Sequence, residues 1–345
     1  MALILANSEE AKSAYTLVIG LQDRFVAKLN QLCNSFGEQK NFEEVTWLRD
    51  EGMHGGGNRF EFRDEKLFNA ASVNVSQVHY DEMPKKNLKS ATAISTIIHP
   101  RNPNIPSVHI HISLTELRDG SSYWRLMADL NPSIYNEHDK NVFDMALSNL
   151  SEDLYEEGKQ QGDKYFYIPV LERNRGVSHF YLEEYQTDNK EDDYSFAKKF
   201  GEGVIDTYIQ IISDAFETRV SCSSREIRAQ IEYHTLYLFQ VLTLDRGTTS
   251  GLLVHNQNDV GIMGSLPAYV DKNLLLSWAQ HVHSPQDELV IALANVINME
   301  GKINRATKVQ LAEVVRSHYK KYPDALSMQA SGNTIPSTVN NHSKS

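Results

Sequence analysis

The stretch 107–115 limits the possible folds of this chain more than any other. Its residues alternate strictly between apolar and polar side chains, which is the period-2 pattern of a half-buried β-strand. The apolar set is Val108, Ile110, Ile112 and Leu114, and the polar set is His109, His111, Ser113 and Thr115. The chain must therefore contain a sheet with one apolar face, and the two histidines share the opposite face. That polar face either lines a cleft or is the solvated side of an antiparallel sheet.

A proline-rich loop precedes this strand and favours the cleft. Pro100, Pro103 and Pro106 each fix their own φ and bias the preceding residue toward extended conformations. We therefore expect a rigid loop that holds His99 and the strand that follows in place. A carboxylate, Asp129, follows about twenty residues after the second histidine. Imidazole and carboxylate groups brought together in this way indicate a site.

Composition excludes several classes of function. The chain has 345 residues and a net charge of −11, which argues against a nucleic-acid or anionic-membrane surface and leaves small molecules or proteins as partners. Cys33 and Cys222 are the only cysteines and lack a metal-ligand spacing. No apolar run approaches the roughly 20 residues of a membrane span. The N-terminus lacks the basic region of a signal peptide. We therefore expect the cytoplasm as compartment.

The order of predicted elements indicates an α+β fold. Helices are predicted from the cap at Ser8 to Gly37 and over 139–162, 192–216, 224–233, 285–301 and 307–319. Strands are predicted over 58–62, 90–114, 124–130, 165–169 and 177–182, and the glycines at 55–57 are interpreted as a tight hairpin or bulge, or else as a loop that approaches a ligand. The segment 235–244 continues the helix before it as an apolar stretch, and it stops at a turn over 245–248. Runs of strands with flanking helices imply an antiparallel or mixed sheet packed by helices.

The domain organisation is predicted to be simple. Residues 1–300 contain no Gly/Ser or Pro-rich linker and no repeat of solenoid period, so we expect one main domain there. A helical C-terminal extension over 301–326 follows. The tail 327–345 is rich in Ser, Asn and Thr with few apolar residues, and we expect it to be disordered.

Several motifs resemble, in order and spacing, those of the oxygen-dependent coproporphyrinogen III oxidases. The resemblance covers roughly residues 10–300, and the first motif is long and specific. The motifs are His99-Pro-x-Asn-Pro-x-x-Pro-Ser-Val-His109, Asp129-Leu-x-Pro132, Tyr165-Phe-Tyr167, Arg175-Gly176, Gln230, Asp245-Arg-Gly-Thr248 and Met263-x-Ser-Leu-Pro267, with Gly55–Gly57 and 68–76 upstream.

The resemblance implies a large antiparallel sheet with helices on both faces, assembled as a homodimer. It also implies a reaction, the oxidative decarboxylation of two propionates of coproporphyrinogen III to vinyl groups, which gives protoporphyrinogen IX in haem biosynthesis. O2 is the co-substrate, and no flavin, haem or nicotinamide is expected. A reduced tetrapyrrole reacts with O2 once a pyrrole N–H is polarised, so the task of the protein would be positioning and electrostatics.

The same resemblance assigns the site. Asp129 would accept a hydrogen bond or proton from the pyrrole nitrogens, and His109 would donate or accept a proton, as suits an imidazole. The expected substrate-binding residues are Ser95, His99, His111, Ser113, Arg125, Arg175 and Gln257. Of the histidines assigned to a divalent cation in some bacterial members, only His99 and His109 remain. Their spacing fits no common zinc motif, so we expect no bound metal.

Departures from the family pattern question the substrate. His111 and Ser113 replace an Asn-x-Arg, the run 124–127 replaces an aromatic residue followed by glycines, and Gln257 stands near another arginine position. Burying a carboxylate without a cationic or multiply hydrogen-bonded partner is costly, although Arg125 and Arg118 are candidates to compensate. Two alternatives therefore stay open: a paralogue that acts on a less anionic substrate, and a non-catalytic dimeric binding protein.

Two pairs of adjacent charged residues also have alternative interpretations. Glu183 and Glu184 either belong to the site or form a solvated charge cluster. Asp245 and Arg246 are predicted to form a salt bridge that orders a turn, in preference to a direct catalytic role.

Overall fold

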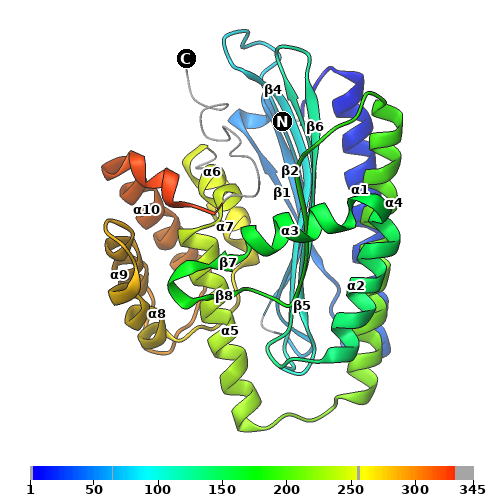
Figure 1. Ribbon diagram of the computed structural model, residues 1–345. Helices are drawn as coiled ribbons and strands as arrows, with labels where there is room; N and C mark the ends of the chain where they lie inside the picture. The colour runs from blue at the N-terminus through cyan, green and yellow to red at the C-terminus, as the bar shows by residue number, and fades with distance from the viewer. Residues whose placement is uncertain (1–2, 64, 255–256, 331–345) are drawn as a thin grey trace.

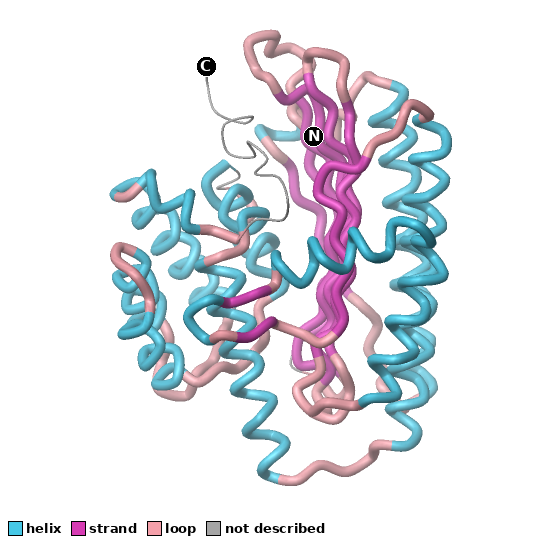
Figure 2. Tube along the Cα trace, viewed as in Figure 1, coloured by secondary structure: helices cyan, strands magenta, loops and turns pink. Residues whose placement is uncertain are grey.

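The structure is a computed structural model that describes residues 3–63, 65–254 and 257–330. Its centre is a seven-stranded sheet in the order β1-β2-β3-β4-β5-β6-β9, and each neighbouring pair is antiparallel (Figures 1 and 2). The predicted α+β class with a large antiparallel sheet is confirmed. The strands are β1 Glu43–Leu48, β2 Gly55–Arg63, β3 Phe68–His79, β4 Leu88–Pro100, β5 Ser107–Leu117, β6 Ser122–Asn131 and β9 Ser178–Tyr185, with β7 Tyr167–Ile168 and β8 Arg173–Asn174 in a separate pair.

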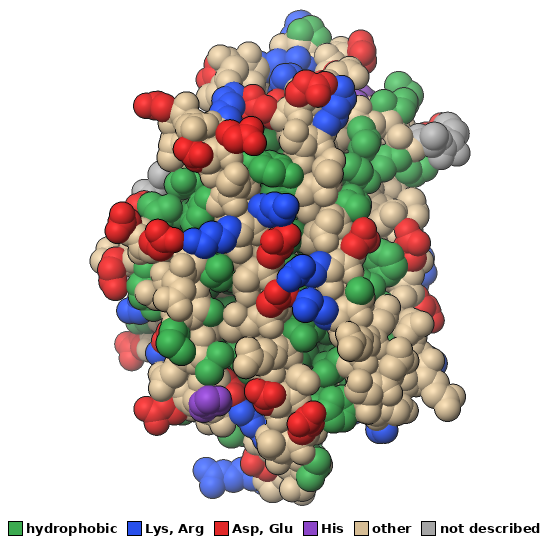
Figure 3. Space-filling model, turned by 90° about the vertical axis from the view of Figure 1, so that its right-hand side faces the viewer, with side chains coloured by type: hydrophobic (Ala, Val, Ile, Leu, Met, Phe, Trp, Pro, Cys, Tyr) green, Lys and Arg blue, Asp and Glu red, His purple; other side chains and the backbone are tan. Residues whose placement is uncertain are grey.

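One face of the sheet is covered by a layer of long helices. These are α1 Glu9–Ser35, α2 Glu137–Ser151 and α4 Lys190–Thr218 (Figure 1). The side chain of Ser8 caps α1 by accepting a hydrogen bond from the amide of Ala11, as the sequence predicts. The alternating apolar residues of β5 all point into the core beneath these helices. The outer surface of this layer carries interspersed acidic and basic side chains (Figure 3), such as Arg24 paired with Asp206.

A second helical layer covers the polar face of the sheet. It consists of α5 Ser224–Thr243, α6 Arg246–Val254, α7 Asp259–Ile262, α8 Lys272–Trp278, α9 Gln286–Val296 and α10 Arg305–Lys321, while α3 Tyr155–Tyr165 packs against β9. The short 3-10 turns are η1 Asp50–Gly52, η2 Glu152–Leu154, η3 Pro169–Leu171, η4 Met263–Ser265, η5 Ala279–His281 and η6 Pro323–Met328. This layer has its own hydrophobic core. Of its helices, α6 and α7 lie nearest the sheet in Figure 1. In the described part of the chain, no helix is long and apolar enough to span a membrane.

The glycine run lies inside strand β2 and not in a turn or a ligand-binding loop. A Cβ on Gly55 would lie 2.0 Å from the carbonyl oxygen of Gln77, and one on Gly57 would lie 1.9 Å from that of Val75. The backbones of β2 and β3 therefore approach so closely that side chains at these positions are excluded. The prediction of a turn here was wrong because the glycines serve strand packing.

Three helix predictions also differ from the structure. The helix predicted over 139–162 is broken at Glu152, whose φ of 47° is left-handed, so that α2 and α3 are separate. The stretch 235–244 is the second half of one long helix, α5, and the predicted turn at 245–248 is the first turn of α6. The helix predicted to end near Gly301 ends at Val296.

The segment after residue 300 is joined to the second helical layer. Leu311 and Val315 of α10 are fully buried in the core of that layer. Residues 327–330 are described and include the end of η6, and the remainder of the predicted tail lies outside the described residues. The division at residue 300 stays a prediction.

Candidate active site

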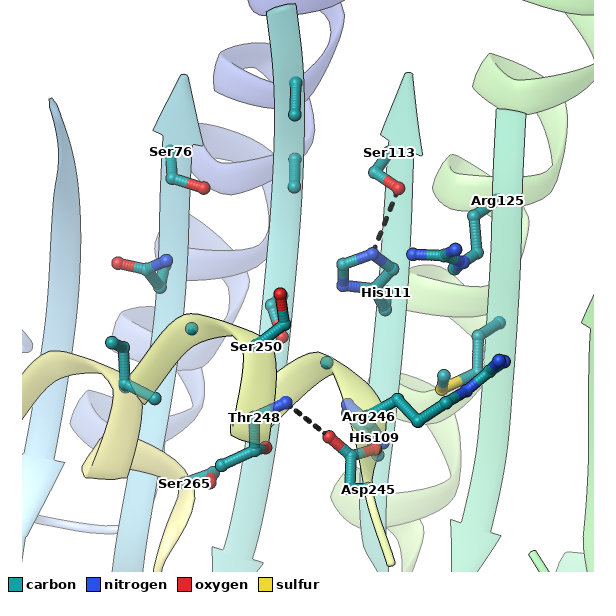
Figure 4. A pocket seen from close by; sticks show the side chains of 18 of the residues that line it. Ser76, His109, His111, Ser113, Arg125, Asp245, Arg246, Thr248, Ser250 and Ser265 are labelled. Carbon is teal, nitrogen blue, oxygen red and sulfur yellow. Dashed lines mark hydrogen bonds between the residues drawn. The ribbon is translucent and has the colours of Figure 1, made fainter. Parts of the chain in front are cut away.

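A cavity of about 290 Å³ lies between the polar face of the sheet and the second helical layer (Figure 4). Strands β3 to β6 form its floor, and α5, α6, α7 and η4 close it from the opposite side. Small side chains occupy the centre of the floor and leave space above the sheet. These residues are Ser76 on β3 and Ala91, Ala93 and Ser95 on β4. The cavity therefore has a flat floor that suits a planar ligand.

A buried ion pair holds His109 from behind. His109 lies directly opposite Asp129 in the pairing of β5 with β6. Asp129 is 0% exposed, and its Oδ2 accepts a hydrogen bond of 2.8 Å from Nη2 of Arg175. The same Nη2 lies 3.1 Å from Nδ1 of His109. Arg175, which is 1% exposed, thus bridges the carboxylate and the imidazole.

Neighbouring groups fix this ion pair. The Arg175 guanidinium lies 4.6 Å from the ring centroid of Phe166 and 4.9 Å from that of Tyr237, a favourable cation–π arrangement. Nδ2 of Asn131 donates a second hydrogen bond, of 2.6 Å, to Oδ2 of Asp129. Burial raises the pKa of Asp129, but the charge of Arg175, together with the hydrogen bond and charge of His109 and the charge of His179, holds that pKa well below its ordinary value. Asp129 is therefore ionised at neutral pH, with its charge compensated.

Nδ1 of His109 faces one permanent donor and one free acceptor. A guanidinium only donates, so Nδ1 of the neutral ring accepts from Arg175 and the ring hydrogen lies on Nε2. Oδ1 of Asp129 lies 3.3 Å from the same Nδ1 and has no hydrogen-bond partner in the described part of the chain. A second proton on the ring turns Nδ1 into a donor toward this oxygen. Nδ1 thus faces both a donor and an acceptor, while the His109 side chain, which is 13% exposed, lines the cavity.

His111 is the second imidazole on the floor, and it is neutral at neutral pH. Burial, followed by the charges of Arg125 and His109, lowers the pKa of His111 to about 3. Its Nε2 lies 3.1 Å from Oγ of Ser113, as the dashed line in Figure 4 shows. His111 therefore acts as a hydrogen-bonding group and not as a cation.

Arg125 supplies the uncompensated positive charge of the cavity. It lies directly opposite Ser113 in the β5–β6 pairing and lines the cavity beside His111 (Figure 4). Its Nε is buried without a hydrogen-bond partner, and the described residues offer the guanidinium neither a hydrogen bond nor an ion pair. An unpaired guanidinium in such a place is unfavourable unless a ligand supplies an anion. Arg125 is thus a ready site for a carboxylate.

The opposite wall carries two further charged groups. Arg246, at the start of α6, donates from Nη2 to Oε1 of Glu183 on β9, which is 1% exposed. Nε and Nη1 of this arginine have no partner within the described ranges. Asp245 accepts a hydrogen bond of 2.8 Å from the hydroxyl of Tyr165 and one of 2.6 Å from the amide of Thr248. Burial raises the pKa of Tyr165 well above its ordinary value, so the phenol keeps its proton and donates a hydrogen bond to Asp245.

Residues 13–298 match the protein-family model described as coproporphyrinogen III oxidase. The chain belongs to this family. It is 27% identical over 290 residues to the mouse protein named oxygen-dependent coproporphyrinogen-III oxidase, mitochondrial, which covers 74% of this chain and 62% of that protein. The human protein of the same name is 27% identical over 290 residues, covering 74% of this chain and 60% of that protein.

The oxygen-dependent coproporphyrinogen-III oxidase of Prochlorococcus marinus (strain AS9601) is 28% identical over 306 residues, which cover 76% of this chain and 84% of that protein. The matches to the mouse and human proteins cover 62% and 60% of their lengths, so the chain spans less than two thirds of the length of these mammalian relatives. Only the mammalian names include a mitochondrial location, so the compartment stays a prediction.

Five of the residues predicted from the coproporphyrinogen oxidase motifs share the floor of the cavity. They come from the three adjacent strands β4, β5 and β6, whose register places them side by side. They are Ser95, His109, His111, Ser113 and Arg125. Their roles toward a substrate stay proposals.

His99 does not reach the cavity. It is 0% exposed, its Nδ1 lies 2.9 Å from Oγ of Ser107, and its Nε2 lies 3.2 Å from the carbonyl oxygen of Ser265. Burial, followed by the proximity of His234, lowers the pKa of His99 well below its ordinary value. The structure places the His99 ring under η4 and outside the cavity, and its contact with substrate stays a prediction.

Gln257 and Arg118 also lie away from the cavity. Gln257 is exposed, and it accepts a hydrogen bond of 2.8 Å from the amide of Asp50 at the edge of the sheet. Arg118 donates to backbone carbonyls, including that of Lys86 at 3.3 Å. The structure therefore places Gln257 and Arg118 outside the cavity, and their roles toward a substrate stay predictions.

Asp129 and Arg175 require a change of role. Both are enclosed behind His109, and neither lines the cavity. The predicted direct contact of Asp129 with pyrrole nitrogens, and of Arg175 with substrate, does not fit this geometry. The pair instead contacts Nδ1 of His109 and orients its ring.

The structure also places the 124–127 run and corrects the prediction for Asp245 and Arg246. Only Arg125 and Met127 face the cavity, because Trp124 and Leu126 alternate into the core under the helices. Arg246 pairs with Glu183 and not with Asp245. The motif Asp245-Arg-Gly-Thr248 marked this wall, but its partner strand was not visible in the sequence.

Metal binding stays a prediction of absence. Among residues 3–63, 65–254 and 257–330, no group of three or more His, Cys, Asp or Glu side chains is placed to hold a metal ion. His99 and His109 have separate surroundings, since one is enclosed by η4 and the other faces the cavity.

Proposed function

We propose that this chain catalyses the oxygen-dependent oxidative decarboxylation of coproporphyrinogen III. One observation carries the proposal: the imidazole of His109 and the unpaired guanidinium of Arg125 face one cavity above a flat floor. The first is suited to proton exchange with a pyrrole, and the second is suited to a propionate. Membership of the coproporphyrinogen III oxidase family supports the choice of reaction.

The chemistry asks for positioning and proton control. For each propionate, the carboxylate leaves as CO2, the CH2 attached to the pyrrole loses a proton, and a C=C bond forms. The two electrons that are released pass to O2, which takes up that proton and one more from solvent and leaves as H2O2. A pyrrole N–H that is polarised or deprotonated makes the reduced ring rich enough in electrons for this reaction. In this proposal His109 accepts or donates the proton at Nε2, with Arg175 as the partner of Nδ1 in the neutral ring and Asp129 as its partner in the charged ring.

Arg125 and Arg246 position the substrate by binding carboxylates. The guanidinium of Arg125 is free, whereas Arg246 retains two unpartnered nitrogens beside its bond to Glu183. Ser95, His111 and Ser113 provide neutral hydrogen-bonding groups between them on the floor.

The enclosed volume implies movement on binding. The cavity of about 290 Å³ lies at the lower limit of ordinary small-molecule sites, and a tetrapyrrole with its side chains is larger. In this proposal α6 and α7, which close the cavity, shift away from the sheet when the ring enters. Hydrogen exchange in 246–254 and 257–262 should therefore slow once coproporphyrin is bound, because the displaced helices then pack on the ligand.

A less anionic porphyrinogen is the second candidate. Arg125 and Arg246 in the cavity are matched by two carboxylates, Glu183 and Asp245, so the lining is close to neutral. A substrate with four carboxylates gains less there than one in which some propionates are already vinyl groups. This balance favours the paralogue alternative over the non-catalytic one, because it leaves the proton-exchange site in place.

The test is an assay of the purified chain. Coproporphyrinogen III is mixed with enzyme under anaerobic conditions, air is admitted, and the vinyl product and CO2 are followed without added metal. The same assay with a porphyrinogen that carries fewer propionates separates the two candidates by kcat/KM. Oxidation of neither substrate by well-folded protein would reject both candidates.

We also propose a homodimer. Strand β1 is at the edge of the sheet and pairs with β2 alone among the described strands, so its outer backbone groups are available to another chain. Light scattering on a sizing column measures the mass, and a monomer at micromolar concentration would contradict the proposal.

A further inference from the structure

A second cavity of about 520 Å³ lies at the edge of the sheet, between β1 and β2 on one side and α7 and α10 on the other. Most of its charged lining comes from β2 and α10. The charged residues are Arg59, Glu61, Arg63, Asp259, Arg305 and Lys308. Four are cationic and two are acidic, so the lining is positive overall.

The carboxylates are already engaged. Asp259 binds Nη1 of Arg316 at 2.7 Å, outside this lining. Glu61 accepts a hydrogen bond of 2.8 Å from Nε of Arg59. Of the two acidic side chains in this lining, Glu61 is therefore the one that pairs with a cation of the same lining.

Two of these cations are buried and incompletely paired. Lys308 is 3% exposed, and the described residues provide no hydrogen-bond or ion-pair partner for its ammonium group. Arg59 is also 3% exposed, and its Nη1 is buried without a partner. Buried cations without partners are costly in a folded protein, and a ligand that accepts hydrogen bonds removes the cost.

We propose that this second cavity binds a small oxyanion, a phosphate or a carboxylate, between Lys308 and Arg59. The ligand oxygens would accept hydrogen bonds from Nζ of Lys308 and from Nη1 of Arg59. Lys308 and Arg305 lie beyond residue 298, where the match to the family model ends. The site is therefore a property of this chain that the family match does not provide.

Binding at this site is coupled to protonation of Lys308. Burial, followed by the charge of Arg63, lowers the pKa of Lys308 well below its ordinary value, while Glu61 opposes this shift and Arg59 adds to it. The other charged groups that line the cavity are Asp259 on α7 and Arg305 on α10. An anion next to the amine favours its charged form, so anion binding raises the pKa of Lys308 and is accompanied by proton uptake wherever the amine of the free protein is neutral.

The oxyanion has two possible sources. Trp47 and Asn258 line both this cavity and the candidate active site, so the two cavities are neighbours. Either a free anion enters from solution, or a carboxylate of a ligand in the active site reaches across. The chemistry at Lys308 is the same in both cases.

The experiment is calorimetric titration of the full chain with inorganic phosphate in two buffers of different ionisation enthalpy. We expect binding with proton uptake, which Lys308→Met removes along with at least about tenfold of the affinity. Glu61→Gln should tighten binding, because it removes the opposing carboxylate and keeps a hydrogen-bonding side chain beside Arg59. Arg59→Gln serves as a second weakening variant if Lys308→Met does not fold.

Titration of the complex with coproporphyrin then identifies the source. Phosphate binding that is unaffected by coproporphyrin indicates a free anion. Displacement of phosphate by coproporphyrin indicates that a carboxylate of the ring occupies the site. The same conclusion follows if phosphate does not bind and Lys308→Met weakens the binding of coproporphyrin. The proposal would be overturned if Lys308→Met bound phosphate and coproporphyrin as tightly as wild type does. It would also be overturned if wild type bound neither ligand. Both results are independent of the activity assay.

Discussion

Replacing Arg125 with methionine should separate substrate binding from stability. Arg125 projects into the cavity from β6, and the described residues give it no anionic partner. The variant removes a contact that only the substrate satisfies. It also removes a buried charge and keeps an apolar side chain of similar length. Activity and stability should therefore change in opposite directions.

The size of the effect follows from the interaction that is lost. A hydrogen bond to a charged group contributes about 1.5–3 kcal/mol, which corresponds to roughly a 10- to 150-fold decrease in kcat/KM. If Arg125 holds a carboxylate that does not react, the loss appears in KM with kcat unchanged. The free energy of unfolding should stay the same or increase, because the folded state no longer buries an unpaired guanidinium. Arg125→Lys keeps the charge without the bidentate geometry and should give an intermediate KM.

Steady-state kinetics with coproporphyrinogen III and urea unfolding of the same samples test both parts. A kcat/KM equal to that of wild type in Arg125→Met would show that Arg125 does not bind substrate. A large decrease in unfolding free energy would show that the guanidinium has a stabilising partner, and the reasoning from its unpaired state would then fail.

Three further predictions concern His109, its partner Asp129, and the packing of β2 on β3 at Gly57. His109→Ala should lower kcat about 10²- to 10⁴-fold if the ring exchanges protons in the reaction, and an unchanged kcat would remove it from the mechanism. Asp129→Ala should cost about 3–5 kcal/mol of unfolding free energy, because Arg175 is left buried without its counter-charge. The pKa of Asp129 is lower in the folded protein than in the unfolded chain. The contribution of Asp129 to the free energy of unfolding is therefore fully present above about pH 4 and is lost as the pH falls toward the pKa of the folded state. Urea titrations from pH 6 downward should show this loss in wild type and not in the variant. Gly57→Ala should prevent folding of the sheet, as seen by circular dichroism, because its Cβ would collide with the carbonyl oxygen of Val75; a soluble, folded variant would contradict the close packing of β2 on β3.

The alternation of β5 was enough to place side chains on the correct face. His109, His111 and Ser113 lie together on the cavity floor because a strand alternates whatever its neighbours are. The pattern gave no register, since register depends on the hairpin between β5 and β6. That Asp129 lies opposite His109 therefore came from the structure, and the sequence supplied only the two residues.

Contacts between distant segments explain why the structure places His99 and Arg246 differently from what the sequence indicates. His99 carries the family motif, yet its exposure is decided by the carbonyl of Ser265 on η4, far along the chain. Arg246 was interpreted as the partner of the adjacent Asp245, whereas the packing of α6 brings it to Glu183 on β9. No periodicity in either segment indicates which strand a helix of the second layer will face. Local patterns thus predicted the floor of the cavity but not its opposite wall.

The pairing of Ser113 with Arg125 explains how the floor keeps a cation although the family motif is altered. The family resemblance places an arginine at position 113, and this chain has a serine there. Residues directly opposite in an antiparallel pair have Cβ atoms about 4.5–5.5 Å apart. An arginine at either position can thus bring its guanidinium to the same part of the cavity floor. The structure places Arg125 opposite Ser113, so a guanidinium from the neighbouring strand is available at this part of the floor. We therefore infer that the altered motif corresponds to a rearranged carboxylate site and not to the loss of one.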